Sequence, residues 1–122
     1  MRDFIEVLFT AEKQHLQRLD YIFCSDEYLL GINNAFLQHN YYTDIISFDL
    51  SPDKGHTIGE IYISTDRVKE NSQLFATNYE TEFLRVLVHG ALHLCGYKDK
   101  TTKDTKLMRL KEDNYIKLYR QL

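Results

Sequence analysis

The sequence has little of what marks membrane or secreted proteins. It holds one proline, Pro52, and two cysteines, Cys24 and Cys95, which we expect to be small buried thiols in a reducing compartment. No apolar run approaches the roughly 20 residues that cross a bilayer, and the first residues lack the charged and then apolar pattern of a secretory signal. We therefore expect a cytoplasmic protein that does not associate with membranes.

A strong positive charge is also missing. The formal net charge is −3 at pH 7, which excludes a protein that coats nucleic acids in general. The charge is uneven, because residues 98–122 hold eight Lys or Arg against four Asp or Glu (+4), while residues 1–97 hold seven against fourteen (−7). The basic segment favours local binding of RNA phosphates, although its lysines could equally form a solvated helix face.

The chain is long enough for one independent core, and we expect a single domain over residues 1–122. Periodicity predicts an α+β fold, with a mixed sheet of three to four strands and packed helices. The expected strands cover 19–25, 45–50 and 58–64, and turn residues at 51–55 predict that the last two form an antiparallel hairpin. Helices are expected over 2–17, after a cap at Ser25, over 66–75, from a capping box of Thr77 and Glu80 through His93, and over 102–121.

Two expected helices have a predicted apolar face. In the helix after Ser25 this face consists of Leu29, Ile32 and Phe36. The last helix is expected to pack against the domain through Leu107, Met108, Tyr115, Leu118 and Leu122.

His89 and His93 are the most informative pair in the chain. Residues four apart project from one face of a helix, so the two imidazoles should be neighbours. Gly96 can end that helix, and the chain after it can bring Asp99 back toward the histidines. Two nitrogens and one oxygen would leave one position of a zinc ion open, as in catalytic sites. The alternative is a pair of helix histidines that are satisfied by backbone or water.

Three sequence blocks together resemble one family. The run His89–Tyr97, followed by Met108, is similar to the zinc-binding signature of the YbeY-type endoribonucleases that mature ribosomal RNA. Residues 43–48, Thr-Asp-Ile-Ile-Ser-Phe, and 58–64, Ile-Gly-Glu-Ile-Tyr-Ile-Ser, resemble two strands of the same family. The resemblance covers about 19–115 in the same order, within the single domain.

This resemblance implies a zinc-dependent, single-strand-specific endoribonuclease. One Zn²⁺ per chain would be held by His89, His93 and Asp99 on a metzincin-like zinc-binding helix. The implied role is maturation of the 3′ end of small-subunit ribosomal RNA, and ribosome quality control. The implied partners are ribosomal RNA and the small ribosomal subunit, with ribosomal proteins and assembly GTPases as further candidates.

The chain departs from the family pattern at two positions. Asp99 stands where the family usually has a third histidine, and its negative charge should make the metal a weaker Lewis acid. The family also commonly carries an arginine near the position of Leu37, so another cation must serve here.

Two further residues are candidates for catalysis. Arg85 lies one turn before His89, where it could bind a substrate phosphate or form a surface ion pair. Glu60 matches an acidic residue of the family strand and is a candidate for proton transfer, or else an outward polar residue of an alternating strand. His39 and Asp44 could line the same cleft, whereas His15 and His56 are expected to be exposed.

Two other functional classes stay open. A non-catalytic, zinc-containing ribosome-assembly factor would explain the altered ligand and the missing arginine. A small metalloprotease would use the same histidine spacing, but it needs a glutamate after the first histidine as general base, and that position is Gly90. RNA carries its own 2′-hydroxyl nucleophile, so an RNA-cleaving enzyme can lack that glutamate.

Overall fold

The computed structural model describes residues 2–121. Within this range it contains five helices and three strands in the order α1 (Arg2–Ala11), β1 (Leu16–Cys24), α2 (Asp26–Leu37), β2 (Ile45–Asp49), β3 (Thr57–Ser64), α3 (Thr65–Leu74), α4 (Tyr79–Leu94) and α5 (Thr102–Gln121). The expected α+β domain with a mixed sheet is confirmed. No helix in residues 2–121 is both long enough and apolar enough to span a membrane.

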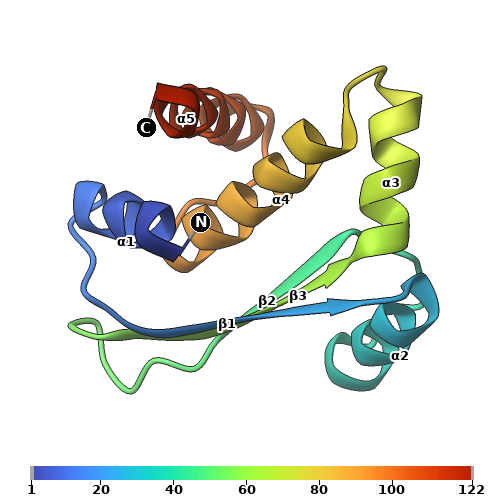
Figure 1. Ribbon diagram of the computed structural model, residues 1–122. Coiled ribbons are helices and arrows are strands. Elements are labelled where there is room, and N and C mark those ends of the chain that lie inside the picture. Colours follow the sequence, from blue (N-terminus) through green and yellow to red (C-terminus); the bar gives the residue numbers. More distant parts are fainter. Residues whose placement is uncertain (1, 122) are drawn as a thin grey trace.

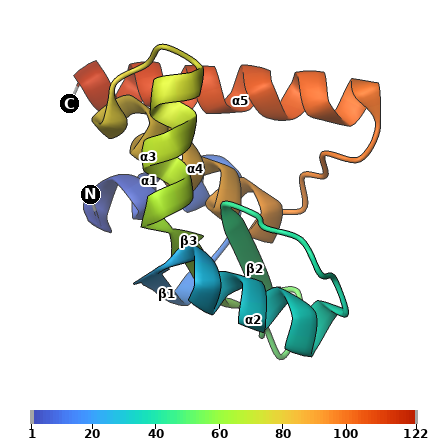
Figure 2. The ribbon, with the colours of Figure 1, turned by 90° about the vertical axis from the view of Figure 1, so that its right-hand side faces the viewer.

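The sheet has the strand order β1-β3-β2. Strand β3 pairs in parallel with β1 and antiparallel with β2, so the expected hairpin of the second and third strands is confirmed. Helix α2 lies on one side of the sheet, and α1, α4 and α5 lie on the other, as Figures 1 and 2 show. The candidate site lies on the side of α4.

Two glycines lie where helix α4 packs against the sheet. A Cβ atom on Gly90 would lie 2.7 Å from Cδ1 of Ile45, and one on Gly59 would lie 2.6 Å from Cδ1 of Leu94. Glycine at both positions leaves room for these side-chain ends, which would have to shift to accommodate a Cβ. The helix therefore holds its histidine-bearing face at a fixed distance above β2.

The first helix is shorter than predicted. It ends at Ala11, and β1 begins at Leu16 rather than at residue 19. Lys13 has a φ of 61°, and the amide of Gln14 donates to the carbonyl oxygen of Phe9 at 2.8 Å, which is the Schellman ending of a helix. The residue in the left-handed position is usually glycine, so a lysine there gives the sequence no stop signal.

Side-chain positions differ from the predictions in three places. Asn78, not Thr77, caps α4, and its Oδ1 accepts from the amide of Thr81 at 2.7 Å. Leu107 and Phe36 were expected to pack inward but are exposed, at 44% and 68%. Leu122 lies outside the described residues. Met108 and Tyr115 are buried as expected.

Candidate metal centre

The two histidines of α4 and one aspartate meet at a single point. His89 Nε2 and His93 Nε2 lie 2.9 Å apart, and Asp99 Oδ2 lies 3.3 Å from the first and 3.4 Å from the second. Within residues 2–121 these three side chains form a group that could hold a metal ion. Zn–N and Zn–O bonds are about 2.0–2.2 Å long, so donors this close together can reach one ion.

The end of α4 explains how Asp99 reaches the histidines. Gly96 has a φ of 103°, and its amide donates to the carbonyl oxygen of His93 at 3.0 Å. The amide of Tyr97 donates to the carbonyl oxygen of Leu92 at 3.1 Å, which completes a Schellman motif. The reversal after Gly96 returns the chain toward the helix, as the sequence predicts.

Hydrogen bonds on the far side of each ring fix the two imidazoles. His93 Nδ1 lies 2.9 Å from the carbonyl oxygen of Tyr97, and His89 Nδ1 lies 2.6 Å from Oε2 of Glu112. A carbonyl oxygen only accepts, so Nδ1 of His93 must donate and Nε2 keeps its lone pair. Such outer partners set the tautomer and orientation of metal-binding histidines. The arrangement therefore fits a metal ion bound through both Nε2 atoms.

Glu112 is a buried carboxylate that joins the site to an arginine. Its side chain is 5% exposed, and its Oε1 accepts from Arg85 Nη1 at 2.9 Å. Arg85 also donates to Asp113 through Nη2 at 2.8 Å. Burial opposes a charge on His89, but the hydrogen bond and charge of Glu112 outweigh it and raise the pKa of the imidazole. Arg85 therefore orients Glu112, which in turn orients His89.

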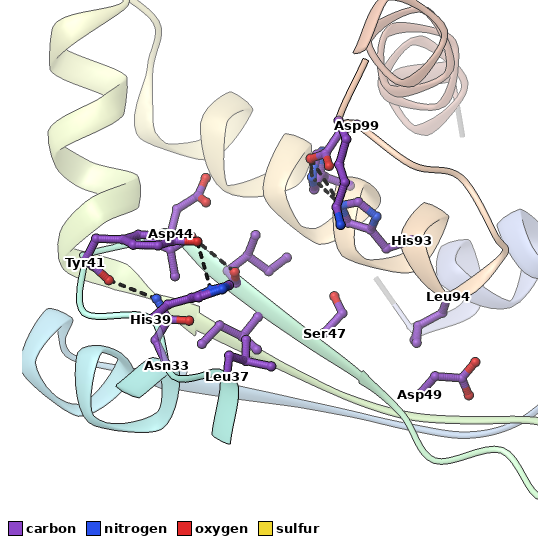
Figure 3. A pocket seen from close by; sticks show the side chains of 15 residues that line it. Asn33, Leu37, His39, Tyr41, Asp44, Ser47, Asp49, His93, Leu94 and Asp99 are labelled. Carbon is purple, nitrogen blue, oxygen red and sulfur yellow. Dashed lines mark hydrogen bonds and ion pairs between the residues drawn. The ribbon is translucent and has the colours of Figure 1, made fainter. Parts of the chain in front are cut away.

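Two adjoining cavities open at the site. The first has a volume of about 570 Å³, and the second has a volume of about 340 Å³. Asp44, His89 and Asp99 line both of them. Burial raises the pKa of the Asp44 carboxyl above its ordinary value. Figure 3 shows His93 and Asp99 on one side of the first cavity, with Tyr41, His39 and Leu37 across from them.

The structure brings some of the predicted site residues together and places others apart. His89, His93 and Asp99 come together, and His39 and Asp44 line the first cavity as expected. Arg85 lines the second cavity, where two carboxylates already hold its guanidinium.

Glu60 does not reach the site. It lies on β3 between Gly59 and Ile61, both of which face α4, and it pairs across the hairpin with Phe48 on the opposite face of the sheet. Successive side chains of a strand alternate between its two faces. Glu60 therefore faces away from α4, and the structure gives no support to the proton-transfer role suggested for it.

The contact between Glu112 and His89 was not predicted from the sequence. Glu112 lies 23 residues beyond His89 on a different helix, so no spacing rule links the two. One signal was available, because Glu112 lies on the buried stripe of α5 with Met108, Tyr115 and Ile116. A carboxylate in such a stripe needs a partner.

The chain is similar to known proteins of one family. Residues 1–120 match the family described as endoribonuclease YbeY. An endoribonuclease YbeY of Cytophaga hutchinsonii is 53% identical over 118 residues, which cover 97% of this chain and 82% of that protein. The endoribonuclease YbeY of Christiangramia forsetii is 49% identical over 119 residues, with coverage of 97% and 82%. A protein of Thermotoga maritima with a known solution structure superposes with a TM-score of 0.61 at 29% identity, over 94% of this chain and 77% of that one.

Proposed function

The chain belongs to the YbeY family of endoribonucleases, and we propose that it cleaves single-stranded RNA with one zinc ion held by His89, His93 and Asp99. The observation that carries this proposal is the convergence of two Nε2 atoms and one carboxylate oxygen, with each Nδ1 already engaged. Three protein donors leave room for a water molecule or a phosphate oxygen, as in catalytic zinc sites. When bound, zinc would act as a Lewis acid on the scissile phosphate or supply a metal-activated water.

The protein residues around the metal would position the RNA. Lys100 lines the first cavity and Arg109 the second, so they are the cations that can contact phosphates where the family arginine is replaced by Leu37. Arg85 has a different role in this proposal, because it holds Glu112 in place. Asp44 lines both cavities and replaces Glu60 as the candidate for proton transfer.

The proposed substrate is ribosomal RNA. By its resemblance to the family, the enzyme would act on small-subunit ribosomal RNA near its 3′ end and in ribosome quality control, in the cytoplasm. Its partners would then be the small ribosomal subunit and the ribosomal proteins and assembly GTPases that attend it.

A non-catalytic ribosome-assembly factor is the second candidate. Asp99 in place of a histidine favours it, because the added negative charge weakens the metal as a Lewis acid. The metalloprotease alternative has no structural support, since a side chain at Gly90 would clash with Ile45 and Ile61 of the sheet. A glutamate there could not act as general base.

The experiment compares cleavage of one single-stranded RNA by four samples. These are the zinc-loaded protein, the chelator-stripped protein, the stripped protein after zinc is restored, and a His93→Ala variant. His56→Ala, an exposed histidine paired with Asp53 outside the cavities, is the control. We expect cleavage only in the zinc-loaded protein, the zinc-restored protein and the control. RNA binding without cleavage in every sample would instead establish the assembly factor.

A further inference from the structure

The first cavity has a second wall that the proposed metal centre does not use. It is formed by the segment between α2 and β2, where the rings of His39 and Tyr41 are stacked with centroids 5.1 Å apart and planes 21° apart. The Tyr41 hydroxyl and His39 Nδ1 lie 2.9 Å apart, within hydrogen-bond distance. Tyr41 is 56% exposed, and His39 is exposed as well. The pair therefore presents a flat aromatic surface to whatever enters the cavity.

Asn33 of α2 holds this wall in place. Asn33 is 2% exposed, and its Nδ2 donates to the carbonyl oxygen of Tyr41 at 2.9 Å. The amide of His39 donates to the carbonyl oxygen of Asn33 at 3.1 Å. Asn33 thus holds both ends of the short segment that carries the two rings, the Tyr41 end through its buried side chain and the His39 end through its backbone carbonyl. Rings that are already positioned lose little conformational freedom when a ligand stacks on them.

Ser47, on β2, carries a buried hydroxyl without a hydrogen-bond partner. Its Oγ is one of two buried side-chain polar atoms in residues 2–121 that have no hydrogen-bond partner, the other being Nε of Arg67. Ser47 pairs with Ile61 across the hairpin, so it faces α4, and it lines the same cavity. Figure 3 shows it on β2 between the aromatic pair and His93. A buried hydroxyl without a partner calls for one, and rotation of the Ser47 side chain can turn Oγ toward a ligand in the cavity that this residue lines.

We propose that this wall is a nucleotide subsite, in which a base of single-stranded RNA stacks on the His39–Tyr41 pair. Ser47 Oγ hydrogen-bonds the sugar-phosphate that joins this base to the scissile phosphate. The inference rests on the proposed function, since it takes RNA as the substrate of the metal centre. Leu37 adds an apolar edge to the same wall.

The chemistry of the wall favours an unpaired base. Every base has a flat π-face that stacks on aromatic side chains, so such a surface binds without strict sequence preference. Bases inside a duplex are already stacked on their neighbours and cannot leave without an energetic cost. The subsite therefore gives a physical reason for the enzyme to select single strands over duplexes.

The test uses a single-stranded 2′-O-methyl RNA that carries one 2-aminopurine. The methyl groups block attack by the 2′-hydroxyl, and gel analysis after each titration confirms that the strand was not hydrolysed by a metal-activated water. Binding to the zinc-loaded protein can then be followed through quenching of the 2-aminopurine fluorescence. Tyr41→Ala should raise the Kd about fivefold or more and abolish the quenching. Tyr41→Phe should keep both, because the ring remains. Ser47→Ala should raise the Kd about threefold while the quenching persists.

Tyr28→Ala is the matched control, because Tyr28 is 55% exposed but does not line the cavity. A Tyr41→Ala variant that binds and quenches like Tyr28→Ala would overturn the subsite, as would wild-type protein that binds no RNA. If the wild type cleaves ordinary RNA but the Tyr41 change affects neither Kd nor KM, the subsite is wrong and the proposed function stands. If quenching depends on Tyr41 but no RNA is cleaved, the subsite stands and the proposed function fails.

Discussion

At the scale of single residues, the candidate metal centre depends on a buried side chain that is not one of its three proposed ligands. Glu112 contacts both His89 and Arg85 from a buried position on α5. Its charge is balanced on one side by the guanidinium, and its other oxygen fixes the imidazole. The carboxylate therefore links the position of α5 to the orientation of the His89 ring on α4.

We expect Glu112→Gln to weaken zinc binding about tenfold, the lower end of the range for outer partners of metal-bound histidines. An amide accepts a weaker hydrogen bond from Nδ1 and makes the ring a poorer donor to the metal. Competition with a chromophoric chelator measures the affinity. Asp113→Asn, which alters the exposed partner of Arg85, should leave zinc affinity nearly unchanged. Equal zinc affinities of the two variants would show that Glu112 does not orient His89.

The site was predictable where local geometry decides it. Four-residue spacing and a glycine stop were enough to bring His89, His93 and Asp99 together. Glu112 was not predictable, because its contact arises only when α5 packs against α4. The orientation of Glu60, by contrast, was predictable. Ile61 and Ile63 face the core, and side chains alternate along a strand, so Glu60 must lie on the other face.

At the scale of elements, the approach of α4 to the sheet should be sensitive to one methyl group. In Gly90→Ala the new Cβ would lie 2.7 Å from Ile45 and 3.0 Å from Ile61. We expect the free energy of unfolding to fall by about 1–3 kcal/mol, because overpacking displaces the sheet side chains. Urea denaturation measures it.

Gly31→Ala is the control for helix propensity, because Gly31 lies in α2 with no atom within 4 Å of its would-be Cβ. This variant should gain up to about 1 kcal/mol. A gain of stability in both variants would contradict the tight packing of α4.

The N-cap of α4 can be tested by substitution as well. Asn78→Ala should lower the free energy of unfolding by about 1 kcal/mol, since it removes the oxygen that accepts from the amide of Thr81. Thr77→Ala should cost less, because the Thr77 hydroxyl makes only a 3.5 Å contact with Glu82. Thermal or urea unfolding of the two variants decides between them, and a larger loss for Thr77→Ala would restore the capping box suggested by the sequence.

Helix and strand boundaries were less predictable than the elements themselves. The hairpin of β2 and β3 and the helix over 102–121 follow from turn residues and periodicity. The end of α1 at Ala11, with Lys13 in the left-handed conformation after it, and the cap at Asn78 do not, because each is fixed by a backbone conformation that several residue types can adopt.

At the scale of the whole molecule, a polar network ties both ends of the chain to the site. Glu12, just after α1, accepts hydrogen bonds from Tyr97 at 2.6 Å, from Lys111 at 3.3 Å and from Tyr115. Tyr97 also provides the carbonyl that orients His93. The sequence shows the excess of basic residues in this region, but it does not show that Lys111 pairs with Glu12.

This network predicts a pH dependence of stability. Burial opposes the charge of Glu12, but the hydrogen bonds from Tyr115, Tyr97 and Lys111 outweigh it and hold its pKa below the ordinary 4.5. A lowered folded-state pKa contributes stability above the unfolded pKa, and that contribution is lost as the pH falls through the folded value. Glu12→Gln should therefore be less stable than wild type at about pH 7, with the difference shrinking below about pH 4.5.

Urea denaturation across this pH range measures the effect. Glu6→Gln, which changes an exposed glutamate of α1, is the control and should show little difference from wild type at any pH. A Glu12→Gln deficit that stays constant from neutral to acid pH would mean that the network does not depend on the ionised carboxylate.

Zinc content decides whether the three-residue cluster is a zinc site. It is determined by elemental analysis of purified wild type beside Asp99→Ala and Asp49→Ala variants. Asp49 lines the same cavity but is not part of the three-residue cluster. We expect about one zinc per chain in the wild type and in Asp49→Ala, and a clear loss in Asp99→Ala. A folded wild type that takes up no zinc when zinc is supplied, or an Asp99→Ala variant that keeps its full content, would contradict it.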